Sequence, residues 1–443
     1  TLLDVDNEGK VVPDLAESYE MKSDTEYVFK LREDACFWDG TPVTAQDVKF
    51  SLDRAKGMPK TKSNTSKIEE VTVNGDHEVT IKLTEPYAAF KTIVTQHNLS
   101  ILSEKAVTEA GDSYGDVDNL LGSGPFKVTE WVPNDHYTLV RNDNYWGEMP
   151  IATSITCRVI PEGSARTIAL EAGEIDVVWS VDPTDCANVE SNPDVKLLSQ
   201  PSTGIDYVGM NTQKEKFSDK RVRQAINYAL DKQTFVDTII EGRGLVANSY
   251  INAAIPGWTD EVEAYPYDPE KAKELLAEAG YPDGFECSIF VNGDLRTRSA
   301  QILQAQLADV GIKVDISTYE WGALLDTLNA GEHEMFLLGW SNTSFDPDGS
   351  TYQLFYSGNH GATGNRAFFS NDKVDELILS AQRESEESKR MELYKELQFV
   401  LHEESPWCPL YYKENNVGVR ADLKGFTLHA GAQHYLGNCH YEE

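Results

Sequence analysis

The chain has 443 residues, of which 40% are hydrophobic and 10% aromatic, so it carries enough apolar material to fold throughout. A chain of this length exceeds one ordinary core, and two or three lobes are expected. The 39 Lys and Arg residues against 73 Asp and Glu give a formal net charge of −34, which argues against binding to nucleic acids or anionic membranes because both need a cationic surface. An acidic ligand is still compatible with this charge, because a cleft can differ in sign from the whole protein.

Targeting and cross-linking signals are sparse. No apolar run reaches the roughly 18 residues of a membrane span. The chain opens at TLLDVDNEGK, which already resembles a strand and turn, so we expect that further chain with a targeting sequence precedes it. The six cysteines form no CxxC pair and fit either buried thiols or up to three disulfides. Neither Cys nor His repeats at ligand spacing, so no zinc site and no cofactor are predicted.

The first part of the chain, about residues 10–112, has a mixed pattern. Strands are predicted at Tyr27–Leu31 and Glu78–Leu83. A helix is predicted between them over Ala45–Gly57, with Thr44 as its N-cap.

Two turns are predicted in the N-terminal half. DVDNEG, Asp4–Gly9, resembles the start of a calcium loop, but Leu15 occupies the position where a bidentate glutamate is required. A hairpin turn is therefore the better interpretation. In a second block, about residues 113–204, strand-like pieces flank the polar turn Pro133–His136 and predict another hairpin.

The third block has the clearest helix signals. Asp219 is predicted to cap a helix whose apolar positions Val222, Ile226, Ala229 and Leu230 share one face. A second helix has Asp268-Pro269 at its start and Gly280 at its end.

After these helices, strands and helices alternate with short connections. The predicted series is Glu286–Val291, Arg298–Gly311, Ile312–Thr318, Trp321–Gly331 and Met335–Trp340. This order is typical of a parallel α/β lobe. The apolar run MFLLG predicts a strand that is buried on both faces.

The stretch GWSNTSFDPDG, Gly339–Gly349, begins where that buried strand ends. Ligands of open α/β sheets bind beyond the carboxyl ends of the strands, so this stretch is predicted to lie at a ligand-binding rim. We find no GxSxG, HExxH, Walker or GxGxxG motif. His333 and His402 each stand beside a glutamate but lack a spaced second histidine, so structural roles are predicted for both. Together these patterns favour a binding protein over an enzyme.

Six segments in a fixed order carry a family resemblance: VPDLAESYE (Val12–Glu20), FWDGTPVTAQDVKFSLDRA (Phe37–Ala55), GSGPFKVTEW (Gly122–Trp131), FSDKRVRQAINYALDK (Phe217–Lys232), YDPEKAKELLAEAGYPDG (Tyr267–Gly284) and TYEWGALLDTLNAGEHEMFLLGW (Thr318–Trp340). With them the chain resembles the extracytoplasmic solute-binding proteins of ABC transporters, family 5, the large three-domain class that includes dipeptide-, oligopeptide- and nickel-binding proteins. The resemblance implies an α/β fold of two lobes joined by crossing strands, which close over the ligand like a hinge. It also implies an export signal and a first strand before Thr1.

The resemblance further implies a division of the chain. The first lobe would consist of residues 1–17, 113–204 and 417–443, and the second α/β lobe of residues 205–416. Residues 18–112 would form the inserted extra domain. The protein would be a monomer in the periplasm or lipid-anchored on the outer face of the cell membrane, and its closed form would be recognised by permease subunits.

The family's ligand contacts map onto the stretch around the last predicted strand. In peptide binders the tryptophan of an E-W pair lines the side-chain pocket, and here it is Trp321. The Gly-Trp pair after the strand offers backbone groups to an extended peptide, which implies contacts at Gly339, Trp340 and Ser341. Three residues after that tryptophan an aspartate normally pairs with the α-ammonium group of the ligand, but this chain has Thr343 there.

Further contacts follow from the same resemblance. Asp346 and Asp348 are the nearest carboxylates, and some longer-peptide binders carry a D-x-D pair at this position, so Asp346 would attract the ammonium group. In dipeptide binders, an arginine before the helix that precedes the second central strand binds the ligand carboxylate. Arg298 matches this arginine, and Arg296 is close by. Tyr207, in the crossing strand DYVGMN, would be a contact on the hinge side.

Plainer interpretations of these residues stay open when the resemblance is set aside. Trp321 and Trp340 suit core or rim positions. The run from Asp346 to Gly349 suits an ordinary turn, and Arg298 suits a solvated position in the first turn of a helix.

The leading functional prediction is capture of a di- or oligopeptide and its delivery to a membrane permease. The rival ligands within the same role are an oligosaccharide, glutathione, an opine-like compound or a nickel chelate. A more distant rival is an enzyme or a receptor-like adhesin on this scaffold.

Overall fold

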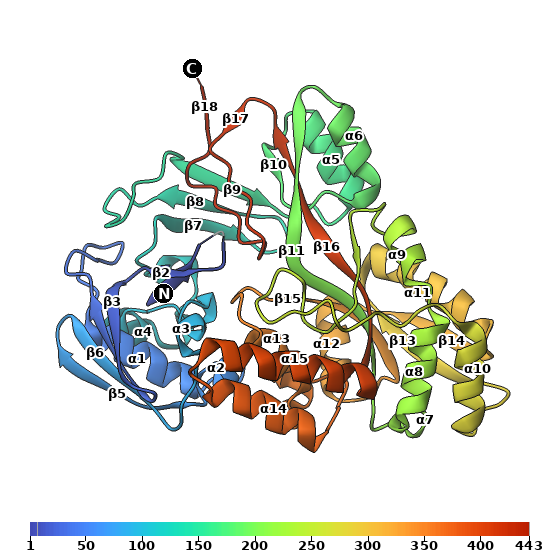
Figure 1. Ribbon diagram of the computed structural model, residues 1–443. Helices are drawn as coiled ribbons and strands as arrows, with labels where there is room; N and C mark the ends of the chain where they lie inside the picture. Colours follow the sequence, from blue (N-terminus) through green and yellow to red (C-terminus); the bar gives the residue numbers. More distant parts are fainter. Residues whose placement is uncertain (7, 443) are drawn as a thin grey trace. The chain divides into compact units, whose positions relative to one another are not determined.

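The computed structural model describes residues 1–6 and 8–442. The chain forms two compact units, one of Thr1–Gln200 with Asn415–Glu443 and the other of Pro201–Glu414, here called unit 1 and unit 2. It enters unit 2 within strand β11 (Val195–Met210) and returns within β16 (Trp407–Arg420) (Figure 1). Residues 18–112 belong to unit 1, and their separation as an inserted domain stays a prediction.

The N-terminal part of unit 1 is a four-stranded antiparallel sheet packed on helices. The strands, in sheet order, are β3 (Ala16–Ser23), β4 (Glu26–Leu31), β6 (Glu78–Leu83) and β5 (Ile68–Gly75). The predicted helix is confirmed as α1 (Ala45–Lys56), and the Asp47 side chain accepts from the Thr44 N–H at 2.9 Å to cap it. Shorter helices follow at α2 (Lys62–Thr65), α3 (Phe90–Ile93) and α4 (Glu104–Ala110).

Both predicted hairpins of unit 1 are confirmed. β1 (Leu3–Val5) pairs with β2 (Val11–Pro13), and β7 (Phe126–Val132) pairs with β8 (His136–Arg141), both antiparallel. The remaining elements of this unit are β9 (Ser154–Arg158), α5 (Gly163–Glu171), β10 (Val177–Val178), α6 (Cys186–Ser191), β17 (Leu423–Lys424) and β18 (His440–Tyr441).

The sheet of unit 2 is mixed. β13 (Phe285–Val291) runs parallel to both β14 (Ile312–Thr318) and β15 (Met335–Ser341), as the alternating strands and helices predicted. β11 pairs with β15 antiparallel, so the lobe is not purely parallel. The difference arises because β11 is the strand that brings the chain in from unit 1 and stands outside the strand–helix–strand series. A short strand, β12 (Gly244–Val246), pairs with β16.

Helices surround this sheet: α7 (Glu215–Ser218), α8 (Lys220–Ala229), α9 (Lys232–Thr238), α10 (Pro269–Glu278), α11 (Gly293–Ala308), α12 (Trp321–Asn329), α13 (Asp348–Phe355), α14 (Asp372–Arg383) and α15 (Glu387–Glu404). The predicted caps are confirmed, because Asp219 accepts from the Arg221 N–H and Asp268 from the Lys271 N–H, each at 2.9 Å. α11 begins earlier than predicted, so Arg298 lies inside the helix.

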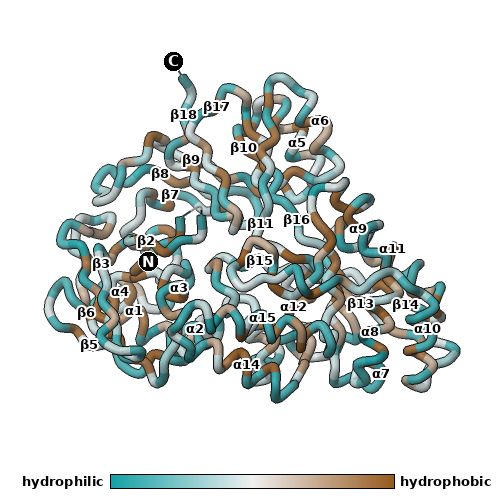
Figure 2. Tube along the Cα trace, in the orientation of Figure 1, coloured by the Kyte–Doolittle hydropathy of each residue, from teal (hydrophilic) through white to brown (hydrophobic). Residues whose placement is uncertain are grey.

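The core of unit 2 lies along its strands. Residues 335–338 of β15 are all buried and form a continuous hydrophobic stretch of the trace (Figure 2), which confirms a strand covered on both faces. All six cysteines are free thiols. Within the described part of the chain, no helix combines the length and apolarity that crossing a bilayer needs.

Candidate functional site

The candidate site lies in unit 2, where β15 ends and α11 begins. β13 and β15 are parallel, so their carboxyl ends meet at one edge of the sheet, and the antiparallel β11 places Gly204–Asp206 beside Gly339–Ser341. We call the rim the set formed by Gly204–Asp206, Arg296, Gly339–Ser341 and Lys413. This edge is where ligands bind in open α/β sheets.

Asp206 is the centre of charge at the rim. Its side chain is 4% exposed, with Lys413 Nζ 3.1 Å from Oδ2 and Arg296 Nη2 3.8 Å from Oδ1. Oδ2 has no hydrogen-bond partner among the described residues, so the close contact with Lys413 is ionic but not aligned as a hydrogen bond. One carboxylate and two cations leave this part of a strongly acidic protein with a local charge of +1.

Two glycines make room for these charged groups. A Cβ atom at Gly339 would lie 3.0 Å from Asp206 Oδ1, and one at Gly204 would lie 2.8 Å from Lys413 Cε. The carboxylate and the lysine stem therefore rest directly on glycine backbone. Any side chain at either position would push them away.

The opposite face of the rim is aromatic. Trp340 pairs with Ile205 across the strands and packs against a small buried cluster with Ala247 and Tyr412. Its indole Nε1 is buried without a hydrogen-bond partner in the described part of the chain.

Polar atoms without partners gather at this end of unit 2. They are Thr203 Oγ1, Asp206 Oδ2, Arg296 Nε and Trp340 Nε1, all buried and without a hydrogen-bond partner among the described residues. A buried polar atom left without a partner costs about 1 to 3 kcal/mol, and most such atoms in folded proteins are paired. Four of the ten buried polar atoms that lack a hydrogen-bond partner among the described residues thus belong to this end of unit 2, and they leave room for added hydrogen bonds.

The last residues of β15 also offer a free backbone edge. β13 pairs with β15 only at Met335 and Phe336 within the described residues, because β13 ends and α11 begins. Gly339–Ser341 therefore have a strand neighbour on the β11 side alone. An open edge of this kind accepts an added strand.

Asp346 and Asp348 have structural partners. Both oxygens of Asp346 accept hydrogen bonds from the Arg390 guanidinium of α15, and both side chains of this ion pair are almost fully buried. Asp348 accepts from Gln382 Nε2 of α14 at 2.9 Å. A ligand ammonium at Asp346 would have to displace Arg390, and the ligand role of Asp346 and Asp348 stays a prediction.

Tyr207 is a buried residue of β11. Its side chain is 2% exposed, and its ring stacks on Trp407 with centroids 3.5 Å apart. Burial raises its pKa well above the ordinary value. The ring is part of the buried interior of unit 2, and the ligand contact of Tyr207 stays a prediction.

The other predicted contacts lie at or near the surface. Trp321, the first residue of α12, is 48% exposed, and Ser341 is exposed. Thr343 and Arg298 are half-buried. Their ligand roles stay predictions.

Asp206 and Lys413 were missed by sequence reasoning. The signal was present, because each is a charged residue within a largely apolar strand, in GIDYVGM and PLYYKEN. Charged residues are rarely buried unless they are paired or functional.

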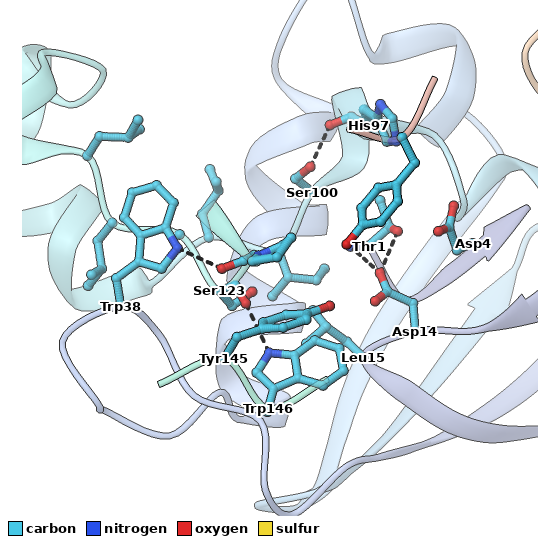
Figure 3. Close-up of a pocket in the computed structure, with 18 of the residues that line it drawn as sticks. Thr1, Asp4, Asp14, Leu15, Trp38, His97, Ser100, Ser123, Tyr145 and Trp146 are labelled. Carbon is cyan, nitrogen blue, oxygen red and sulfur yellow. Dashed lines mark hydrogen bonds and ion pairs between the residues drawn. The ribbon is translucent and has the colours of Figure 1, made fainter. Parts of the chain in front are cut away.

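Unit 1 contains a separate cavity of about 460 Å³ with an aromatic wall (Figure 3). Trp38 Nε1 donates to Gly124 O at 3.1 Å, and Trp146 Nε1 donates to Ser123 O at 3.0 Å. Both indoles thus point toward the turn of the GSGPF segment (Figure 3). Their hydrogen bonds are satisfied within the protein, which favours a structural role for this wall.

The rim combines a free strand edge with buried polar atoms that lack hydrogen-bond partners among the described residues, at the edge of the sheet where ligands bind in open α/β folds. Comparisons with known proteins agree with it. The model of the family "Bacterial extracellular solute-binding proteins, family 5 Middle" matches residues 10–362. The chain therefore belongs to the bacterial extracellular solute-binding proteins of family 5.

Individual relatives span almost the whole chain. The dipeptide-binding protein of Escherichia coli (strain K12) is 30% identical over 470 residues, covering 98% of this chain and 86% of the relative. The glutathione-binding protein GsiB of the same strain is 31% identical over 446 residues, covering 96% and 85%. The ABC transporter-associated periplasmic binding protein DppA from Helicobacter pylori, solved with the peptide STSA, has a TM-score of 0.93 and 29% identity, and the match covers 100% of this chain and 92% of that one.

Proposed function

We propose that this protein captures a di- or oligopeptide outside the cell and delivers it to the permease of an ABC importer. The observation that carries the proposal is the free edge of β15 at Gly339–Ser341. A peptide added there as a strand would be held by main-chain hydrogen bonds, which tolerate many side chains. A dipeptide-binding relative and a structural neighbour that holds a peptide support this ligand class.

Side chains around the edge would orient the peptide. Arg298, in the early turns of α11, would bind the carboxylate end. Trp321, exposed at the start of α12, would line a side-chain pocket, and Thr343 would lie beside the peptide without charge. Trp340 Nε1 would find the partner it lacks in the described residues.

Capture would end in closure of the two units. We place the hinge at β11 and β16, because the chain passes between the units only within these two strands. The permease would recognise the closed monomer, free in the periplasm or lipid-anchored at the membrane. The ligand would be retained without turnover.

Native mass spectrometry of the purified protein tests the proposal through the solute that co-purifies. Peptide masses at one copy per chain are expected. A mass of glutathione, a sugar, an opine-like compound or a metal chelate would indicate that the protein binds this ligand instead of a peptide, in the same role. A solute that is chemically converted during incubation would contradict the binding function itself.

A further inference from the structure

We propose that Asp206 receives the ammonium group of the ligand, and that Lys413 takes the place of this group in the ligand-free protein. The inference rests on the proposed function and deepens it, because it assigns the ligand a primary amine. It also gives roles to Asp206 on β11 and Lys413 on β16, the two strands through which the chain passes between the units.

The geometry around Asp206 is that of an incompletely bound carboxylate. Lys413 Nζ is 3.1 Å from Oδ2 without hydrogen-bond alignment, and Arg296 Nη2 is 3.8 Å from Oδ1, beyond hydrogen-bond reach. An ionised carboxylate has room for about four hydrogen bonds. A ligand ammonium with three donors would supply bonds that neither residue makes.

Lys413 is the partner that can leave. Its side chain is 36% exposed, against 22% for Arg296, so its ammonium reaches water with little movement. An ammonium is also more strongly hydrated than a guanidinium and regains more hydration on release. Arg296 would stay beside the carboxylate.

Asp206 is also the carboxylate that lies beside the free edge of β15. The residue three positions after Trp340 is not acidic, and the next acidic residue, Asp346, is held by Arg390. Asp206 lies opposite Gly339 on the neighbouring strand, one residue from the partner of Trp340. The carboxylate at this edge of the sheet is therefore supplied by β11.

Replacement of the Lys413 ammonium by that of the ligand would change a contact between β11 and β16, the two strands that connect the units. Asp206 lies on β11 and Lys413 on β16, and Ser202 Oγ donates to Lys413 O at 2.7 Å to join the same two strands. Lys413 is the residue before Glu414, where unit 2 ends. Ligand binding would therefore break a charge link between the two strands beside the proposed hinge.

The test compares two pools of peptides of two to six residues, one with free amino ends and one N-acetylated, by native mass spectrometry of the whole chain. Wild type should retain the free-amine pool about 10- to 100-fold better, the range of one charged hydrogen-bonded pair. Asp206→Asn should bring this ratio close to 1. Lys413→Met should raise retention of the free-amine pool, because the internal competitor is removed, whereas the surface variant Lys220→Met should change nothing.

The outcomes separate the inference from the proposed function. Equal retention of both pools by wild type, or an unchanged ratio in Asp206→Asn, would overturn the inference and leave peptide binding standing. If neither peptide pool binds, the solute that co-purifies with the protein from cells is released. It is then acetylated at its amino groups and added back to the ligand-free protein. Loss of rebinding after acetylation would support the role of Asp206 but exclude a peptide as the ligand. Rebinding equal to that of the unmodified solute would overturn the role of Asp206. If no solute co-purifies at all, both the role of Asp206 and the proposed function would be contradicted.

Discussion

At the scale of single residues, the candidate site depends on close contacts that leave no space for a side chain at Gly204 or Gly339. Asp206 rests on the backbone of Gly339, and the stem of Lys413 rests on Gly204. The unpaired atoms of Thr203, Arg296 and Trp340 lie around them. These are the groups to which a ligand can add hydrogen bonds, and substitutions among them should change affinity more than stability.

Gly339→Ala is expected to weaken binding of a free-amine ligand about 3- to 10-fold. A partial weakening of the charged hydrogen bond between Asp206 and the ligand ammonium costs about 1 kcal/mol. The new Cβ would meet Asp206 Oδ1 at 3.0 Å and shift the carboxylate. Calorimetric titration measures the loss. Gly75→Ala is a matched control, because a Cβ there has no neighbour within 4 Å. Equal affinity of Gly339→Ala and wild type would show that Asp206 does not contact the ligand.

Asp346→Asn is expected to lower the free energy of unfolding by about 3 to 5 kcal/mol, because it leaves the buried Arg390 guanidinium without its counter-ion. The affinity of the folded variant for ligand should stay close to that of wild type. Denaturant titration measures the first quantity and calorimetry the second. Normal stability combined with lost affinity would restore Asp346 as the ammonium site.

At the scale of helices and strands, local chemistry made much of the fold predictable. α8 and α10 begin where Asp219 and Asp268 cap them, since such caps act within a few residues. The buried strand β15 could be recognised from its apolar run alone. The antiparallel direction of β11 could not, because strand direction depends on pairing between segments far apart in sequence.

The site was only partly predictable for the same reason. Gly339 and Trp340 lie at the end of a strand that was recognised, so their place at the rim could be predicted. Asp346 stands equally close in sequence, yet its charge is satisfied by Arg390, which lies 44 residues away. Asp206 and Lys413 are about 200 residues apart, and only the folded structure brings them together.

His333 gives a pH dependence at this scale. It lies just before β15 and is fully buried, its Nε2 is 2.9 Å from Arg366 O, and burial lowers its pKa from 6.5 to about 4. The folded state therefore requires the neutral ring. The stability it contributes is complete above pH 6.5 and is lost as the pH falls toward 4, by up to about 3 kcal/mol.

Denaturant titrations at pH 7 and pH 4.5 check this expectation. Wild type should lose more free energy of unfolding between the two values than His333→Gln, whose side chain does not titrate. The comparison between the two proteins removes the contribution of other histidines, such as His402 and His434. Identical losses in both proteins would mean that His333 is not held neutral by burial.

At the scale of the whole molecule, the chain is divided so that each unit has its own core and only β11 and β16 connect the two. This connectivity is what the proposed hinge at β11 and β16 requires. The excess of 34 negative charges is carried by the protein as a whole, while the charges of Asp206, Arg296 and Lys413 sum to +1. Ligands with both an ammonium and a carboxylate group suit such a site.

Closure predicts a change of size in solution. Small-angle X-ray scattering should show a smaller radius of gyration when a saturating free-amine ligand is added to wild type. Asp206→Asn should need about 10 to 100 times more ligand to reach the same radius. A radius that does not change in wild type under saturation would argue against hinge closure at β11 and β16.

The most direct test of the account is one ratio, the dissociation constant of an N-acetylated peptide divided by that of the same peptide with a free amino end, measured by calorimetry. We expect this ratio to be about 10 to 100 for wild type and close to 1 for Asp206→Asn. A ratio that is the same in both proteins would contradict the assignment of the rim around Asp206 as the ligand site.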